Sequence, residues 1–169
     1  MAEQFLTLMA DLDEDTQIRM SAWYTALQNV GFTGKQTPGL PYHISLATFS
    51  TDEEAMAVET MHHAAAMFSA VEVHISHIGI FPGGKVLFGA PEVNLSLTAL
   101  HEACCIHTES PHPWTPHVTL LIEEPENICA AVPVLVKSFY PFIGRITRLH
   151  LCAFWPTREI ASAALTGNR

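Results

Sequence analysis

Two short segments of the sequence carry the same pattern of residues that could do chemistry. "PYHISLA" contains His43 and Ser45, and "TPHVTLL" contains His117 and Thr119. Each segment has a histidine, an aliphatic residue, a hydroxyl residue and then a leucine. Side chains alternate between the two faces of a strand, so the histidine and the hydroxyl of each segment point the same way. The aliphatic residues point the other way and can pack beneath helices.

Two imidazoles and two hydroxyls in one groove suit in-line substitution at phosphorus. One imidazole can take a proton from the nucleophile while the other gives a proton to the leaving oxygen, because free histidine titrates near pH ~6.5. The hydroxyls of Ser45 and Thr119 can donate to the non-bridging phosphoryl oxygens, where negative charge gathers. The pattern lacks the carboxylates and cysteines of a metal site, so we expect neither metal nor cofactor.

A single H-x-S segment carries little information, and the chain contains a third copy that shows why. "VHISHIG" places His74 and Ser76 at the same spacing, but no proline precedes it closely and His77 stands where the other copies have leucine. It also follows a predicted helix directly, where the other copies follow a loop. We interpret it as a partly exposed strand face and expect His43 and His117 to be the functional pair.

The paired motifs make the chain resemble the 2H phosphoesterase superfamily, which includes 2′-5′ RNA ligases and 2′,3′-cyclic nucleotide phosphodiesterases. That family has two H-x-[ST] motifs, each followed by an apolar residue; here the two histidines are 74 positions apart in 169 residues. The resemblance implies an α+β fold with two pseudo-symmetric lobes of mainly antiparallel sheet, outer helices and a central cleft. It also implies that His43 and His117 are the general acid and base, and that Ser45 and Thr119 bind the phosphate.

The residues after the second motif narrow the expected substrate. RNA ligase-like members commonly have basic residues there, whereas this chain continues with Leu121, Ile122, Glu123 and Glu124. We therefore expect a metal-independent phosphodiesterase acting on a 2′,3′-cyclic phosphate or a related small phosphoester. Two alternatives stay open: RNA end-processing or 2′-5′ RNA ligase activity, and a catalytically silent protein that binds a nucleotide or phosphorylated metabolite.

Three aromatic residues are candidates for substrate binding. Tyr42 and Trp114 lie just before the two motifs and could stack on a base, and Phe81 could line the cleft. The alternative is that all three only pack. The cations most able to hold a phosphate are Lys85, Arg145, Arg148 and Arg158.

The pattern of apolar residues, turns and caps predicts the order β-α-β-α-β-β-α-β-α-β-β in a single domain over residues 1–169. We expect Asp13 or Asp15 to cap the first helix, Thr51 and Glu54 to form a capping box, and Pro133 to kink or break the last helix. The predicted strands cover 4–13, 43–49, 71–81, 85–91, 117–123, 144–155 and 158–165. The predicted helices end near 30 and cover 51–70, 93–109 and 124–140.

Composition limits the class of protein. Hydrophobic residues make up 49% of the chain, which is enough for a core, and 8 Lys+Arg against 17 Asp+Glu give a formal net charge of −9. Such a chain is not expected to hold long nucleic acid, although a small nucleotide or an RNA end remains a plausible partner. The acidic start of the chain is no signal peptide and no apolar run suits a membrane span, so we expect a cytoplasmic protein with reduced cysteines. The sequence does not determine the oligomeric state.

Overall fold

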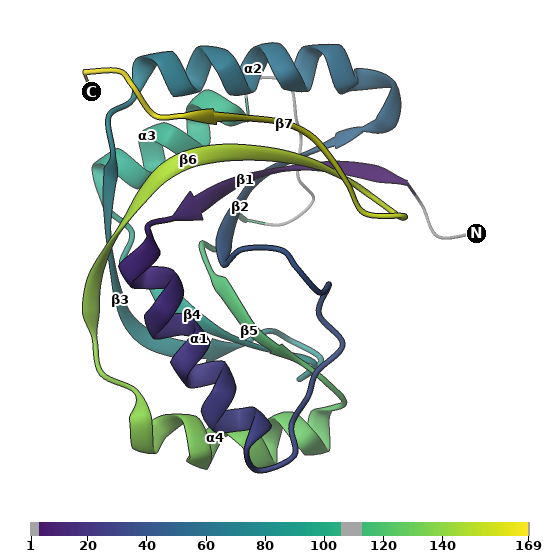
Figure 1. Cartoon of the computed structure of the whole chain (residues 1–169), viewed down its shortest axis with the longest axis vertical. Helices are drawn as coiled ribbons and strands as arrows, with labels where there is room; N and C mark the ends of the chain where they lie inside the picture. Colours follow the sequence, from purple (N-terminus) through teal and green to yellow (C-terminus); the bar gives the residue numbers. More distant parts are fainter. Residues whose placement is uncertain (1–3, 106–112, 169) are drawn as a thin grey trace.

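The computed structural model describes residues 4–105 and 113–168, and within them seven strands form one antiparallel sheet (Figure 1). Hydrogen-bonded neighbours follow the order β2-β1-β6-β3-β4-β5, and β7 pairs with β6. The α+β class and the order of elements agree with the sequence prediction. The strands are β1 (Phe5–Leu12), β2 (His43–Ser50), β3 (Val71–Ile80), β4 (Val86–Pro91), β5 (Val118–Ile122), β6 (Phe142–Phe154) and β7 (Arg158–Ala164).

One long strand, β6, joins two lobes. Its first residues, Phe142 to Ile146, pair with β3, and Ile146 to Phe154 pair with β1. The first lobe therefore contains β2, β1, β7 and most of β6, and the second contains β3, β4, β5 and the start of β6. The sheet curves so strongly that its two end strands, β2 and β5, come into contact inside the curve (Figure 1).

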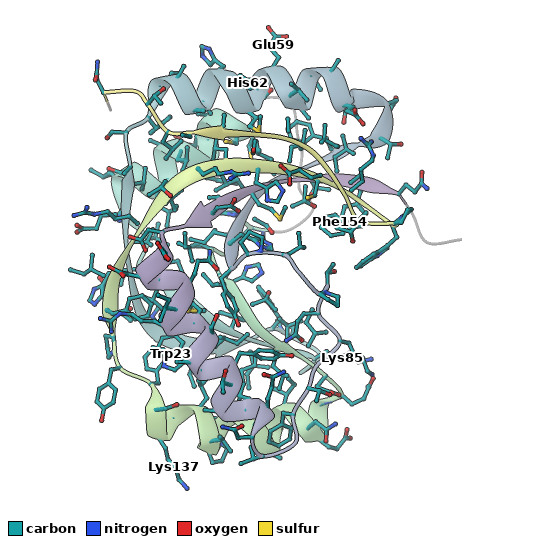
Figure 2. The ribbon with its side chains drawn as sticks, in the orientation of Figure 1. Trp23, Glu59, His62, Lys85, Lys137 and Phe154 are labelled. Atoms are coloured by element: carbon teal, nitrogen blue, oxygen red, sulfur yellow. The ribbon has the colours of Figure 1, made fainter. Side chains whose placement is uncertain are left out.

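Helices cover the outside of both lobes. The helix α2 (Glu54–Met67) lies with α3 (Leu95–Cys104) on the first lobe, and α1 (Glu14–Gln28) lies with α4 (Pro125–Ser138) on the second (Figure 1). Trp23 of α1 shows how the second lobe closes: its ring stacks on Phe139 at 4.7 Å between centroids (Figure 2). Its indole N–H also donates to the Ser138 carbonyl at 3.2 Å.

The first strand is buried on both faces. Leu6, Leu8 and Ala10 belong to the main core beneath the helices. On the opposite face Met9 packs with Cys152 and Phe154 of β6 in a small second cluster. This second cluster gives the inner, concave face of the first lobe an apolar floor, on which polar side chains can be held rigidly.

Local signals set the starts of the helices, with one displacement from the prediction. Asp13 caps α1, as expected, because its carboxylate accepts from the backbone N–H of Thr16 at 3.0 Å. The predicted Thr51–Glu54 capping box is wrong by one residue: the Glu53 carboxylate accepts from the backbone N–H of Ser50 at 2.8 Å. A 3₁₀ turn, Thr51–Glu53, therefore precedes α2.

Of the two outcomes predicted for Pro133, a kink or a break in the last helix, the break does not occur. The helix α4 continues through it to Ser138. Pro133 lies on the exposed face, where a backbone carbonyl that loses its helical partner can bond water instead, while Ala131 and Leu135 stay buried on the other face.

Side chains cover the open edges of both end strands. Gln36 donates to the Leu120 carbonyl and accepts from the Ile122 N–H along β5, each at 3.3 Å. On β2, the Leu46 carbonyl accepts from His101 at 2.9 Å. Exposed strand edges favour aggregation, and these bonds occupy them.

Other predictions are met in part. The third predicted helix is observed as α3, while residues 106–109 at its end, and His112 in the loop that follows, lie outside the described residues. Cys104 and Cys152 are buried thiols. None of the helices in the described ranges has the length and apolar character needed to cross a membrane.

Candidate functional site

The two motif histidines are held in the same way at equivalent places. His43 is the first residue of β2, and its Nδ1 lies 2.8 Å from the Pro41 carbonyl oxygen. His117 immediately precedes β5, and its Nδ1 lies 2.8 Å from the Thr115 carbonyl oxygen. A carbonyl only accepts hydrogen bonds, so Nδ1 carries the proton in both rings. Nε2 is then the nitrogen that can take or give a proton.

The fold brings the two motifs together across the inside of the curved sheet. Their strands, β2 and β5, are in contact, and the Trp114 indole N–H, three residues before His117, donates to the Ser45 carbonyl at 2.9 Å. The charge of His117 is also among the causes that shift the pKa of His43. Ser45 and Thr119 follow their histidines by two residues along the strands and are partly exposed.

His117 has aromatic neighbours. Its ring meets Phe81 edge-on, with centroids 4.7 Å apart and an angle of 90°, and it lies 5.5 Å from Phe88. Phe88 fits because Gly79 faces it from the paired strand, where a Cβ atom would lie 2.4 Å from the Phe88 ring. Phe81 thus lies beside the catalytic candidate, where a lining residue is expected; its contact with substrate stays a prediction.

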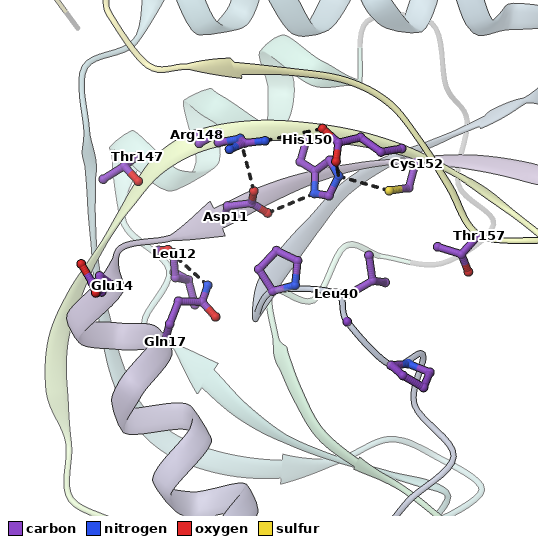
Figure 3. A pocket seen from close by; sticks show the side chains of 14 residues that line it. Asp11, Leu12, Glu14, Gln17, Leu40, Thr147, Arg148, His150, Cys152 and Thr157 are labelled. Carbon is purple, nitrogen blue, oxygen red and sulfur yellow. Dashed lines mark hydrogen bonds and ion pairs between the residues drawn. The ribbon is translucent and has the colours of Figure 1, made fainter.

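His43 has charged neighbours instead. Asp11 is its register partner on β1, and Arg148 is the partner of Asp11 on β6. The Arg148 Nε lies 3.8 Å from Asp11 Oδ2, and His150 Nδ1 lies 3.6 Å from Asp11 Oδ1 (Figure 3). The strands β1 and β6 therefore present a carboxylate, a guanidinium and a second imidazole next to the first motif.

Burial lowers the pKa of both motif histidines below the ordinary value. For His43 the Pro41 carbonyl and the Asp11 charge act in the opposite direction, while positive charge on His117 and His150 adds to the lowering. For His117 only the Thr115 carbonyl opposes the effect of burial. Both rings are therefore predominantly neutral near pH 7, and each is able to accept a proton.

The two aromatic residues before the motifs are engaged in packing. The Tyr42 backbone exchanges hydrogen bonds with the Gln17 side chain at 2.7 and 2.8 Å. Burial raises the pKa of the Tyr42 hydroxyl, and a hydrogen bond with Ser21 of α1 partly offsets that rise. Trp114 stacks on His101 with centroids 3.8 Å apart. These contacts agree with the packing alternative, and base stacking by either residue stays a prediction.

The third H-x-S copy lies apart from this arrangement. His74 pairs with Glu92, Nδ1 to Oε1 at 3.3 Å, and both side chains are substantially exposed. Its register partner Ile143 is exposed as well. This strand face looks outward, as the sequence prediction has it.

Of the four candidate cations, Arg148 is the one that lines a pocket near a motif histidine. Lys85 lies 3.5 Å from Glu124, which also pairs with Lys35 at 2.8 Å. Arg158 pairs with Glu54 at 2.7 Å. Arg145 is exposed on the strand β6.

Sequence reasoning missed three members of the group beside His43: Asp11, His150 and Glu159. A signal for one strand was present, because Arg148, His150 and Cys152 alternate with Leu149 and Leu151 in β6. That period marks a polar face opposite a buried one. No three His, Cys, Asp or Glu side chains in the described part of the chain are arranged to hold a metal ion.

Comparisons with known proteins agree with this fold. The family model of the 2′-5′ RNA ligase superfamily matches residues 16–154. E. coli LigT has a similar structure, with a TM-score of 0.64 and 19% identity over 96% of this chain and 98% of LigT. A solved phosphoesterase structure has a TM-score of 0.67 and 19% sequence identity, over 97% of this chain and 99% of the phosphoesterase. The structure of TT0787 of Thermus thermophilus has a TM-score of 0.69 and 15% sequence identity, over 98% of this chain and 100% of TT0787. No curated protein sequence matches the chain.

Proposed function

The chain belongs to the 2′-5′ RNA ligase superfamily of 2H phosphoesterases, and we propose that it is a metal-independent phosphodiesterase that opens a 2′,3′-cyclic phosphate or a related small phosphoester. The observation that carries the proposal is the matched pair of histidines. Each is anchored through Nδ1 to the carbonyl two residues before it, on strands that meet inside the curved sheet. Two fixed imidazoles with available Nε2 atoms are what concerted proton transfer needs.

The proposed step is hydrolysis by in-line displacement. One Nε2 removes a proton from water as its oxygen forms a new bond to phosphorus. The bond from phosphorus to one ribose oxygen breaks, and the second Nε2 gives that oxygen a proton. The product is an acyclic phosphomonoester, and the two imidazoles end with their protonation states exchanged. Water then restores the starting states.

The surroundings of the two rings support different roles for them. Burial lowers the pKa of both rings, so the reactive form is the minority form in which a single ring is protonated. The charge of Asp11 opposes the lowering at His43 alone, so we assign His43 as that ring, the general acid. His117 has Phe81 and Phe88 against it, and burial lowers its pKa without an opposing carboxylate. A ring in that setting favours its neutral form, and we assign it as the general base.

Ser45 and Thr119 complete the proposed site. Each lies on the same strand face as its histidine, two residues further on. Their hydroxyls donate to the two non-bridging phosphoryl oxygens, which gain charge in the transition state. This role requires no metal ion.

A small nucleotide is the substrate class that the comparisons support. E. coli LigT has been crystallised with 3′-AMP, with ATP and with NADP⁺. In this chain the cations nearest the end of β5, Lys35 and Lys85, are paired with Glu124. That pairing leaves little positive charge there for a polynucleotide and favours a compact substrate over a long RNA.

Turnover and binding measured on the same samples test the proposal. Purified protein should hydrolyse 2′,3′-cyclic nucleotides with and without a chelator, and His43→Ala and His117→Ala should abolish most of the rate. Binding of these nucleotides without turnover of any phosphoester would favour the silent binding protein instead. Activity confined to RNA ends, with steep salt dependence, would favour the RNA-processing alternative.

A further inference from the structure

A pocket of about 620 Å³ opens beside the loop 38–41, which leads into His43 and β2 (Figure 3). Its floor is formed by β1 and β6, one wall by the loop 38–41 and another by the start of β7. The pocket and the proposed catalytic site share a boundary: Pro41 lines the pocket, and its carbonyl holds His43. Its volume lies within the range of small-molecule sites.

Negative charge dominates the lining. Asp11, Glu14 and Glu159 contribute three carboxylates, against the single guanidinium of Arg148. The lining is net negative even when His150 is protonated. The guanidinium is also already engaged, at 3.8 Å from Asp11, 3.6 Å from Glu159 and 2.7 Å from the Ser162 hydroxyl.

Two buried polar atoms in this pocket lack hydrogen-bond partners among the described residues. They are Asp11 Oδ1 and His150 Nδ1, which are 3.6 Å apart on side chains of residues only 7% and 5% exposed. Both atoms are shielded from solvent and face each other, so this pair belongs to the floor of the pocket and a ligand meets the exposed side chains of the lining instead. The exposed carboxylates of the lining are those of Glu14 and Glu159. A carboxylate only accepts hydrogen bonds, so a group bound against them must donate.

Covalent chemistry by the thiol in this pocket is disfavoured. Cys152 Sγ lies 3.2 Å from His150 Nε2, which with Asp11 makes a chain of thiol, imidazole and carboxylate. Burial, followed by the charges of Glu159 and Asp11, raises the pKa of Cys152 to about 11. The thiol stays protonated at neutral pH and is a poor nucleophile, which leaves binding as the use of the pocket.

We infer that this pocket is the subsite for the group that the phosphoester carries, and that it selects an uncharged group rich in hydroxyl and amino donors, such as a nucleoside with no second phosphate. The inference rests on the proposed function for the placement of the phosphoryl group at His43 and His117. Ribose hydroxyls and base amino groups can donate to Glu14 and Glu159. A second phosphate would meet a net negative wall whose guanidinium is already occupied.

Binding of two ligands that differ by one phosphate tests the subsite. Isothermal titration at low ionic strength would give Kd for 3′-AMP and for adenosine 3′,5′-bisphosphate, and for the matched 2′-phosphate pair. We expect the monophosphate to bind about tenfold more tightly than the bisphosphate. Glu159→Gln should narrow this ratio about threefold, and Glu159→Lys should narrow it further. Both changes are at a residue whose side chain is 58% exposed, so folding should survive.

A matched control separates the effect of a charge in the pocket from the effect of the net charge of the protein. Glu59→Gln removes the same charge from the outer face of α2, away from the pocket (Figure 2), and should leave the ratio unchanged. Equal or tighter binding of the bisphosphate to the wild type, absence of binding by either ligand, or a ratio insensitive to both Glu159 variants would overturn the subsite. Hydrolysis of 2′,3′-cyclic AMP in the same samples tests the proposed function separately, since discrimination without turnover would overturn only catalysis.

Discussion

The two motif histidines have the same backbone anchor but opposite surroundings. His43 lies beside Asp11 and the charged side chains of β6, and His117 lies against Phe81 and Phe88. The repeat therefore supplies two copies of one device, an imidazole presented through Nε2. The side chains of the neighbouring strands then give the two imidazoles different environments. Different environments suit a reaction in which one ring acts as the general base and the other as the general acid.

The largest expected effect comes from removing either ring. His43→Ala and His117→Ala should each lower kcat/KM for a 2′,3′-cyclic nucleotide by about 10²–10⁴-fold. The double variant should lose far less than the product of the two losses, because the rings act as a unit. Circular dichroism would confirm that the variants fold. Losses that multiply fully would show that the two histidines work independently.

The choice of leaving group should distinguish the two roles. With a phosphodiester whose leaving group is an activated phenol, the general acid is needed less, because the phenolate departs without a proton. The deficit of His43→Ala should then shrink to about tenfold, while that of His117→Ala should stay near its value with the cyclic nucleotide. The reverse pattern would exchange the assignments of acid and base.

Substitution of the neighbours should move the two pKa values in opposite directions. Phe81→Ser admits water to His117, so its pKa should rise toward the ordinary value. Asp11→Asn removes a charge that favours the imidazolium, so the pKa of His43 should fall further. NMR titration of the imidazole C–H signals measures both pKa changes. If Asp11→Asn changed the pKa of His117 as much as that of His43, the pKa of His43 would not be set by its own neighbour Asp11.

The lowered pKa values also predict how stability depends on pH. The unfolded chain binds protons on these histidines near pH ~6.5, while the folded chain binds them at lower pH. The contribution of these two histidines to the free energy of unfolding is therefore fully present above pH ~6.5. It is lost as the pH falls toward their pKa values in the folded state. Thermal unfolding should show a midpoint a few degrees lower in mild acid, and His43→Asn should reduce that loss. If the unfolding midpoint of this variant depends on pH as steeply as that of the wild type, groups other than His43 cause the loss of stability in acid.

The smallest effect is expected at the third copy of the motif. His74→Ala should change kcat/KM by less than about twofold, because this ring pairs with Glu92 on an outward face. It also serves as a control for the two large effects. A loss comparable to that of His43→Ala, in a folded protein, would mean that the functional pair was chosen wrongly.

The sequence was sufficient for the features that repeat along it. Strand alternation predicted that each hydroxyl shares a strand face with its histidine, and the flanks of "VHISHIG" predicted that His74 lies apart from His43 and His117, on an outward face. Asp11 could not be found in this way, because it sits in an apolar strand and meets His43 only through the β1–β2 register. Glu159 is the register partner of Cys152 on β6, and this pairing brings its carboxylate to 3.7 Å from His150 Nε2. Contacts set by strand pairing depend on bulges and curvature, which short sequence patterns do not encode.

The continuity of β6 has a mechanical consequence for the cleft. A hinge needs a few residues that can change their backbone angles freely, whereas β6 passes from one lobe to the other while hydrogen-bonded to β1 on one edge and to β3 and β7 on the other. Gly144, near the crossing, is packed so closely that a Cβ atom would lie 2.2 Å from the Thr16 hydroxyl. The sheet is thus one bent plate, and a change in the separation of the two motif histidines would require the whole sheet to bend.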